Sequence, residues 1–130
     1  MLTDKITTLI ADYNNTALDA VNLPKLMEIR QKLVCLGYEL GVETAKFKRE
    51  FDSAYASRKI NFFKSKSKYL DEGVSKAEVI AEMENSTDRE VEKNKEGLYS
   101  GCKIILSQCN QVIGSLVQDI SILKTEFNNQ

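Results

Sequence analysis

After its one proline, at position 24, the chain contains no residue type that regularly breaks a helix except a few glycines. Apolar residues recur at steps of three or four on both sides of Gly73, and this spacing places their side chains along one face of an α-helix. We therefore predict an all-α protein, with a short N-terminal helix followed by a long, antiparallel, coiled-coil-like helical hairpin.

We expect residues 1–130 to form a single helical domain. Residues 1–22 form a short helix and a loop, residues 24–70 form a long helix, and residues 75–127 form a second long helix. Pro24 suits the first turn of the first long helix, and Gly73 supplies the turn between the two. Ser75 and Glu78 have the spacing of a capping box at the start of the second.

Both long helices carry apolar stripes. On the first, the stripe comprises Leu26, Ile29, Leu33, Leu36, Leu40, Phe47, Phe51, Tyr55 and Phe62. On the second, a heptad-like seam comprises Leu98, Cys102, Ile105, Cys109, Val112, Leu116, Ile120, Leu123 and Phe127. A short third helix covers only part of the surface that these stripes expose. We therefore expect a homo-oligomer.

Composition excludes several classes of chemistry. The chain has no histidine, which excludes Ser-His-Asp and Cys-His catalysis and most zinc sites. The carboxylate pairs Glu78/Glu82 and Asp88/Glu92 each share a helix face that could serve a metal, but such pairs are far more often solvated carboxylates with lysine neighbours. The sequence contains no glycine-rich phosphate loop. We expect a protein that is not an enzyme and uses no cofactor.

The three cysteines are not spaced as metal ligands or as a disulfide framework. The hairpin register allows Cys35 and Cys109 to approach each other, although packing explains both thiols as well. The N-terminus lacks the pattern of a secretory signal, and no stretch approaches the roughly 20 apolar residues that span a bilayer. Free thiols fit a reducing compartment, so we expect a cytoplasmic protein without a membrane contact.

Charge is distributed unevenly along the chain. Residues 41–70 contain eight basic and three acidic residues, and residues 71–97 contain nine acidic and four basic ones. The basic run reads as a phosphate-binding face, with Phe62, Phe63 and Tyr69 as aromatic groups that stack on bases. In a hairpin, however, the acidic run lies alongside and neutralises it. Both interpretations hold if basic residues that face away from the partner helix remain available.

The run Lys59-Ile60-Asn61-Phe62-Phe63 resembles a motif of the recombination mediator protein family of T4-like phages. The motif is a basic, an aliphatic, an Asp or Asn and two aromatic residues near the end of a lysine-rich helix. As in that family, a glycine-containing turn and an acidic helix follow, and the segment 106–113 resembles a second family segment. The resemblance covers residues 45–115. The chain departs from the family in lacking tryptophan and in having serine-interleaved lysines in place of a glycine-rich segment.

The resemblance implies a non-enzymatic accessory factor in the cytoplasm of a bacterial host. Such a factor oligomerises, binds single-stranded DNA and helps to load a recombinase where single-strand binding protein had been. By the match to the motif, Lys59 is the basic residue, and Phe62 and Phe63 are the aromatic pair. Charge alone adds the remaining candidates for DNA binding, Arg58, Lys64, Lys66 and Lys68.

Helical spacing refines this site and leaves alternatives open. Lys59 and Phe63 are four residues apart and share one face, which we expect to lie away from Tyr55 and Phe62. Two other functions also fit a helical hairpin. One is a protein–protein adaptor or inhibitor of phage or mobile-element origin, and the other is a structural coiled-coil subunit.

Overall fold

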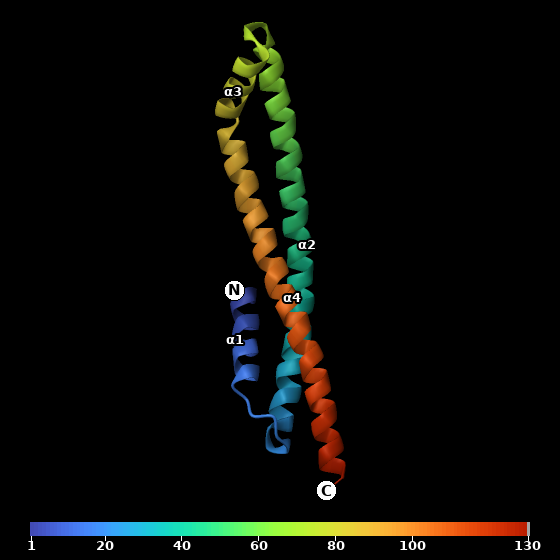
Figure 1. Ribbon diagram of the computed structural model, residues 1–130. Helices are drawn as coiled ribbons and strands as arrows, with labels where there is room; N and C mark the ends of the chain where they lie inside the picture. The colour runs from blue at the N-terminus through green and yellow to red at the C-terminus, as the bar shows by residue number, and fades with distance from the viewer. Residues whose placement is uncertain (130) are drawn as a thin grey trace. The chain divides into compact units, whose positions relative to one another are not determined.

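The computed structural model describes residues 1–129, and all regular structure in that range is helical. The predicted all-α fold is therefore confirmed. Figure 1 shows four α-helices joined by short connections, two of which contain a single 3₁₀ turn. The helices are α1 (Leu2–Asn14), α2 (Leu23–Lys68), α3 (Val74–Glu84) and α4 (Ser86–Asn128), and the 3₁₀ turns are Ala20–Asn22 and Leu70–Glu72.

The first long helix begins where the sequence indicates. Pro24 is the second residue of α2, where its missing N–H costs no hydrogen bond. Just before it, the Asp19 carboxylate accepts a hydrogen bond from the backbone N–H of Asn22 at 3.2 Å. This contact fixes the tight turn that leads from α1 into α2.

The helices form two compact units within the chain, for which we predicted a single helical domain. We call residues 1–44 and 101–129 the aliphatic unit and residues 45–100 the polar hairpin. The N-terminal part of α2 belongs to the aliphatic unit and its C-terminal part to the polar hairpin. In α4 the N-terminal part belongs to the polar hairpin and the C-terminal part to the aliphatic unit. The two units differ in what holds their helices together.

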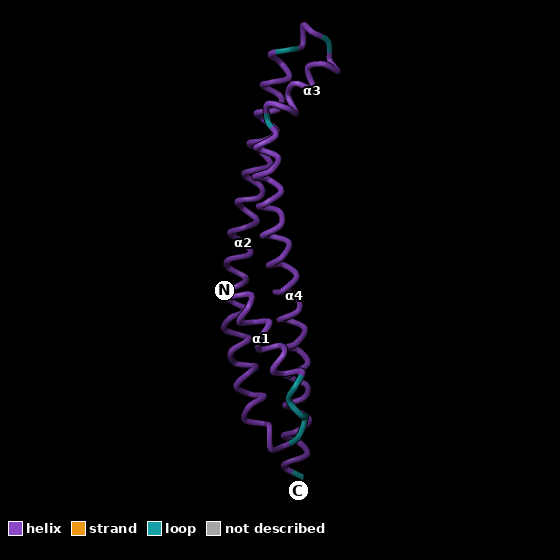
Figure 2. Tube along the Cα trace, turned by 90° about the vertical axis from the view of Figure 1, so that its left-hand side faces the viewer, coloured by secondary structure: helices purple, strands orange, loops and turns teal. Residues whose placement is uncertain are grey.

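The aliphatic unit has a conventional hydrophobic core. Its buried side chains are Ile6, Leu26, Ile29, Leu33, Leu40, Cys102, Cys109, Leu116, Ile120 and Leu123. All but Ile6 belong to the two predicted stripes. Helix α1 lies beside α2 and α4 (Figures 1 and 2), and the Tyr13 hydroxyl donates a hydrogen bond to Asp119 of α4. Leu98 and Phe127, the two ends of the predicted seam, are exposed in the single chain.

The thiols occupy two kinds of environment. Cys102 and Cys109 are buried, and their burial raises the pKa of both thiols. Cys35 is exposed whereas Cys109 is buried, so the approach of the two thiols that the hairpin register left open is not observed. Cys109 instead lies against Gly37 and donates a weak hydrogen bond to the carbonyl of Leu33 at 3.5 Å. A shift of two residues in register accounts for the difference.

The polar hairpin has little hydrophobic core. Within residues 45–100, the buried hydrophobic side chains are Ala77 and Ala81 of α3. Phe51 stacks on Tyr99 with ring centroids 6.5 Å apart, but both rings are only half-buried. Tyr55 is 40% exposed, so its assignment to the core is wrong. The part of the α2 stripe that lies in this unit is therefore a minor source of stability.

The turn of the hairpin lies where predicted, but its chemistry differs. Gly73 has φ +102° and ψ 149°, a conformation that residues with a Cβ rarely adopt. Helix α3 starts at Val74 with Gly73 as its N-cap and has no side-chain cap, so the predicted capping box of Ser75 and Glu78 is wrong. Glu78 instead accepts a hydrogen bond from Lys66 across the hairpin.

The predicted continuous helix over residues 75–127 is interrupted at Asn85. Its side-chain amide donates to the carbonyl of Ala81 at 2.8 Å and to the hydroxyl of Ser65 at 3.0 Å. Asparagine competes for backbone groups in this way and commonly ends helices. The second long helix is therefore divided into α3 and α4 (Figure 2), and the hydrogen bond to Ser65 joins the break to α2.

Candidate nucleic-acid interface

The seven residues predicted to bind DNA all lie in the last part of α2, but they do not form one patch. Their neighbours divide them into basic residues paired with carboxylates, residues on an exposed side with a half-buried ring beside them, and lysines on another exposed side. The first set is Arg58 and Lys66, and the second is Lys59 and Phe63 with the half-buried Phe62. The third set is Lys64 and Lys68.

Two of the basic residues are neutralised within the hairpin. Arg58 forms an ion pair with Glu92 of α4, and each side chain is only 15% exposed. The Lys66 ammonium lies 3.1 Å from a carboxylate oxygen of Glu78 in α3. For Arg58 and Lys66, mutual neutralisation of the basic and acidic runs is therefore the better interpretation.

Lys59 and Phe63 share an exposed side of α2, as their spacing predicts. The Lys59 ammonium nitrogen lies 5.1 Å from the centroid of the Tyr55 ring, within the range of a cation–π contact. The expectation that this face lies away from Tyr55 is therefore wrong. Phe63 is 55% exposed, and it contacts Phe62 edge-to-face with ring centroids 5.6 Å apart. We call Tyr55, Lys59 and Phe63 the aromatic side of α2.

The remaining two lysines lie on a different side of the helix. Lys64 and Lys68 are four residues apart and exposed, and within residues 1–129 neither has a carboxylate partner. Each residue of an α-helix turns about 100° from the previous one, so Lys64 lies well around the helix from Lys59. A single bound strand cannot contact both sides by lying straight along α2.

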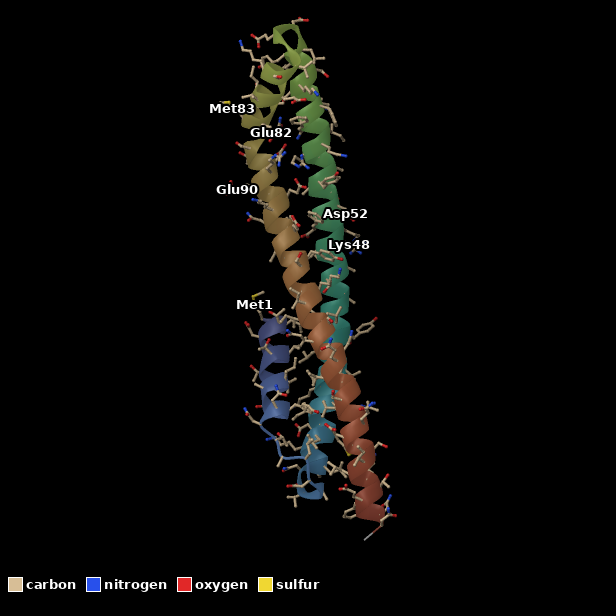
Figure 3. The ribbon with its side chains drawn as sticks, viewed as in Figure 1. Met1, Lys48, Asp52, Glu82, Met83 and Glu90 are labelled. Atoms are coloured by element: carbon tan, nitrogen blue, oxygen red, sulfur yellow. The ribbon has the colours of Figure 1, made fainter. Side chains whose placement is uncertain are left out.

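Sequence reasoning missed Tyr55 as a surface residue. It lies one helical turn before Lys59, so the i, i+4 spacing was a signal for the cation–π contact. The guanidinium carbon of Arg58 also lies 5.4 Å from the centroid of the same ring. Farther toward the N-terminus of α2, Lys48 and Asp52 are exposed (Figure 3). The acidic residue Asp52, opposite in charge to Lys59, therefore precedes the aromatic side.

The four carboxylates considered as metal ligands each have a partner in the protein. Glu78 pairs with Lys66, and Glu92 pairs with Arg58. The Glu82 carboxylate of α3 pairs with Arg89 of α4 at 2.6 Å. Asp88 accepts a hydrogen bond from the side-chain amide of Asn61 at 2.8 Å. These contacts make the four carboxylates part of the hairpin's own network of polar contacts.

The comparisons with known proteins add no relative. The chain matches no protein-family model, no curated protein and no solved structure. In the part of the chain that the structure describes, no helix is both long and apolar enough to cross a membrane.

Proposed function

We propose that the chain binds single-stranded DNA through the aromatic side of α2. The observation that carries the proposal is the exposed alternation of Tyr55, Lys59 and Phe63 along one side of a helix. An ammonium group contacts a phosphate, and an exposed ring stacks on a base whatever its sequence. The half-buried ring of Phe62 supports Phe63 from behind, which reduces the entropy lost when a base stacks on it.

We further propose that the protein is a non-enzymatic recombination mediator. This role follows from the resemblance of residues 59–63, and it implies a recombinase and a single-strand binding protein as partners. A mediator presents several strand sites together, which requires self-association. Apolar side chains left exposed on the aliphatic unit, Met27, Val34 and Val117, support a homo-oligomer. Static light scattering measures this, and a mass near 14.7 kDa at micromolar concentration would contradict it.

A second function, the protein–protein adaptor, is favoured by a different surface. Val79 and Met83 of α3 are 59% and 72% exposed and are four residues, about one turn, apart. Met83 is labelled in Figure 3. Exposed aliphatic side chains at this spacing suit a partner helix better than a nucleic acid. An adaptor would bind its partner through α3 and would have no affinity for a DNA strand.

Fluorescence anisotropy with a labelled oligothymidylate separates the two functions. We expect binding that weakens steeply as salt rises, because bound phosphates release counterions. Phe63→Ala removes one stacking ring and should weaken binding by about 5- to 150-fold, the equivalent of roughly 1–3 kcal/mol. Val79→Ala is the matched control, since it shortens an equally exposed apolar side chain on α3.

The outcomes are distinct. Loss of affinity in Phe63→Ala with no loss in Val79→Ala supports the DNA interface. Absence of binding by the unmodified protein at low salt contradicts it. Circular dichroism of both variants checks that the helices are intact, because Phe63 is exposed and its truncation should leave the fold unchanged.

A further inference from the structure

The two sides of the polar hairpin are joined mainly by charged and polar contacts. Three ion pairs link α2 to α3 or α4, and three further hydrogen bonds, two of them accepted by carboxylates, join the two sides of the hairpin. The ion pairs are Arg58–Glu92, Lys66–Glu78 at 3.1 Å and Lys95–Glu50 at 3.2 Å. The hydrogen bonds are Asn61 to Asp88 at 2.8 Å, Tyr69 to Glu84 at 2.8 Å and Asn85 to Ser65 at 3.0 Å.

Apolar burial adds little to this seam. The largest fully buried side chains of the described residues all belong to the aliphatic unit: Ile6, Leu26, Leu33, Leu40, Leu116 and Cys109. In the polar hairpin, the buried hydrophobic side chains are two alanines, each with a single methyl group. Because hydrophobic stabilisation is roughly proportional to the apolar area buried, the two units must depend on it to very different degrees.

We propose that the polar hairpin is an electrostatically latched arm that opens as ionic strength rises while the aliphatic unit stays folded. Salt shortens the Debye length from about 10 Å at 0.1 M to about 3 Å at 1 M, which weakens partly exposed ion pairs. Sodium chloride does not weaken hydrophobic burial in the same way. The inference does not depend on DNA binding.

The ion pairs differ in how strongly they respond to salt. Lys66 and Glu78 are 25% and 51% exposed, and Lys95 and Glu50 are 37% and 34% exposed, so water and ions reach both pairs. Arg58 and Glu92 are screened least, but either group left without the other is a half-buried charge with no partner. Rising salt therefore weakens Lys66–Glu78 and Lys95–Glu50 first, and Arg58–Glu92 is the last of the three ion pairs to break.

Opening has a structural consequence for α2. Separation of the helices releases Arg58 from Glu92 and fully exposes the half-buried rings of Phe51 and Phe62. Without its partner helix, the segment 45–68 is a helix of marginal stability in water. Its backbone amides then exchange with solvent, which makes the opening measurable.

Hydrogen–deuterium exchange of the intact protein tests the arm without any ligand. Exchange is compared at about 0.05 M and about 1 M sodium chloride at one pH. We expect peptides from residues 47–66 and 76–95 to exchange about tenfold faster at high salt, the equivalent of roughly 1.4 kcal/mol. Peptides from 26–40 and 104–123 should change by less than twofold. An equal change in both units, or none in the arm, would overturn the proposal.

Variants identify the latch. Glu92→Gln leaves the Arg58 guanidinium without its carboxylate, so the arm should exchange about tenfold faster even at low salt. Glu90→Gln is the matched control, because Glu90 is exposed (Figure 3) and, within residues 1–129, has no partner. The double variant Arg58→Leu with Glu92→Leu removes both charges and leaves no unpartnered one, so at low salt the arm should stay closed and exchange as the unmodified protein does. If it exchanges as fast as Glu92→Gln at low salt, Arg58–Glu92 is not the latch and the proposal is wrong.

Discussion

The Sγ atom of Cys109 lies 3.1 Å from the position that a Cβ atom would take at Gly37. Cys109 is fully buried, and its thiol donates to the carbonyl of Leu33 one turn before Gly37. The absence of a side chain at position 37 therefore allows α2 and α4 to approach closely. Gly41, one turn farther along α2, has no such neighbour within 4 Å of its own Cβ position.

Alanine at these two glycines should have opposite effects. Gly41→Ala should raise the free energy of unfolding by about 0.5–1 kcal/mol, because alanine loses less backbone entropy in a helix. Gly37→Ala should lower it by about 1 kcal/mol, because the new methyl displaces the buried Cys109 thiol. Urea denaturation followed by circular dichroism measures both. Equal stabilisation by the two substitutions would show that Cys109 yields without cost.

The three thiols should differ sharply in reactivity. Cys35 is exposed, whereas burial raises the pKa of the thiols of Cys102 and Cys109 and shields them from reagents. In the native protein, we expect Ellman's reagent to modify one thiol rapidly and the other two only after unfolding. Cys35→Ser is the control and should remove the rapid phase. A rapid phase of more than one thiol would contradict the packing of the aliphatic unit.

Helix positions could be predicted because local spacing determines them. The proline at position 24, the apolar steps and the glycine at position 73 were sufficient to locate α1, α2 and the hairpin turn. The break at Asn85 could not be predicted in the same way. The Asn85 amide bonds both the carbonyl of Ala81 in its own helix and Ser65 in the opposite helix, and the apolar pattern on either side does not change.

Predictions that required the register of the hairpin were less successful. The partner of Cys109 is Gly37 rather than Cys35, because a shift of two residues moves a side chain to another face. The same dependence governs the candidate site. The face shared by Lys59 and Phe63 follows from spacing within one helix, whereas the neutralisation of Arg58 requires knowing that Glu92 lies opposite it.

Tyr13 should make the protein sensitive to high pH. Burial, with a hydrogen bond to Asp119, raises the pKa of the Tyr13 hydroxyl from 10.0 to about 12. The folded state therefore retains a proton that the unfolded state loses above pH 10, so this stabilisation is complete below about pH 10 and is lost as pH rises to about 12.

The corresponding variant isolates this effect from the titration of other groups. Tyr13→Phe lacks the hydroxyl, so its stability should fall less between about pH 10 and about pH 12 than that of the unmodified protein. Urea denaturation at several pH values measures the two slopes. Parallel slopes would mean that the hydroxyl does not hold its proton in the folded state.

Gly73 should not tolerate a side chain, although no atom lies within 4 Å of its Cβ position. Its φ of +102° is the reason, since the cost is conformational rather than steric contact with neighbours. Gly73→Ala should lower the free energy of unfolding of the polar hairpin by about 1–3 kcal/mol. Gly97→Ala is the control, because Gly97 lies inside α4 with open space around it. No loss in Gly73→Ala would mean that the turn adopts another conformation.

Two lysines on different sides of α2 provide the sharpest test of where DNA binds. Lys59 lies on the aromatic side with Tyr55, and Lys64 lies well around the helix from it. Lys59→Ala and Lys64→Ala remove the same charge from the same helix, so a purely non-specific attraction would weaken equally in both. We expect Lys59→Ala to reduce the slope of log affinity against log salt by about 0.7, the value for one phosphate contact on a single strand, and Lys64→Ala to leave it nearly unchanged. Anisotropy titrations at several salt concentrations measure both slopes. Equal loss in the two variants would mean that the attraction is non-specific, and loss confined to Lys64→Ala would move the interface away from Tyr55 and Phe63.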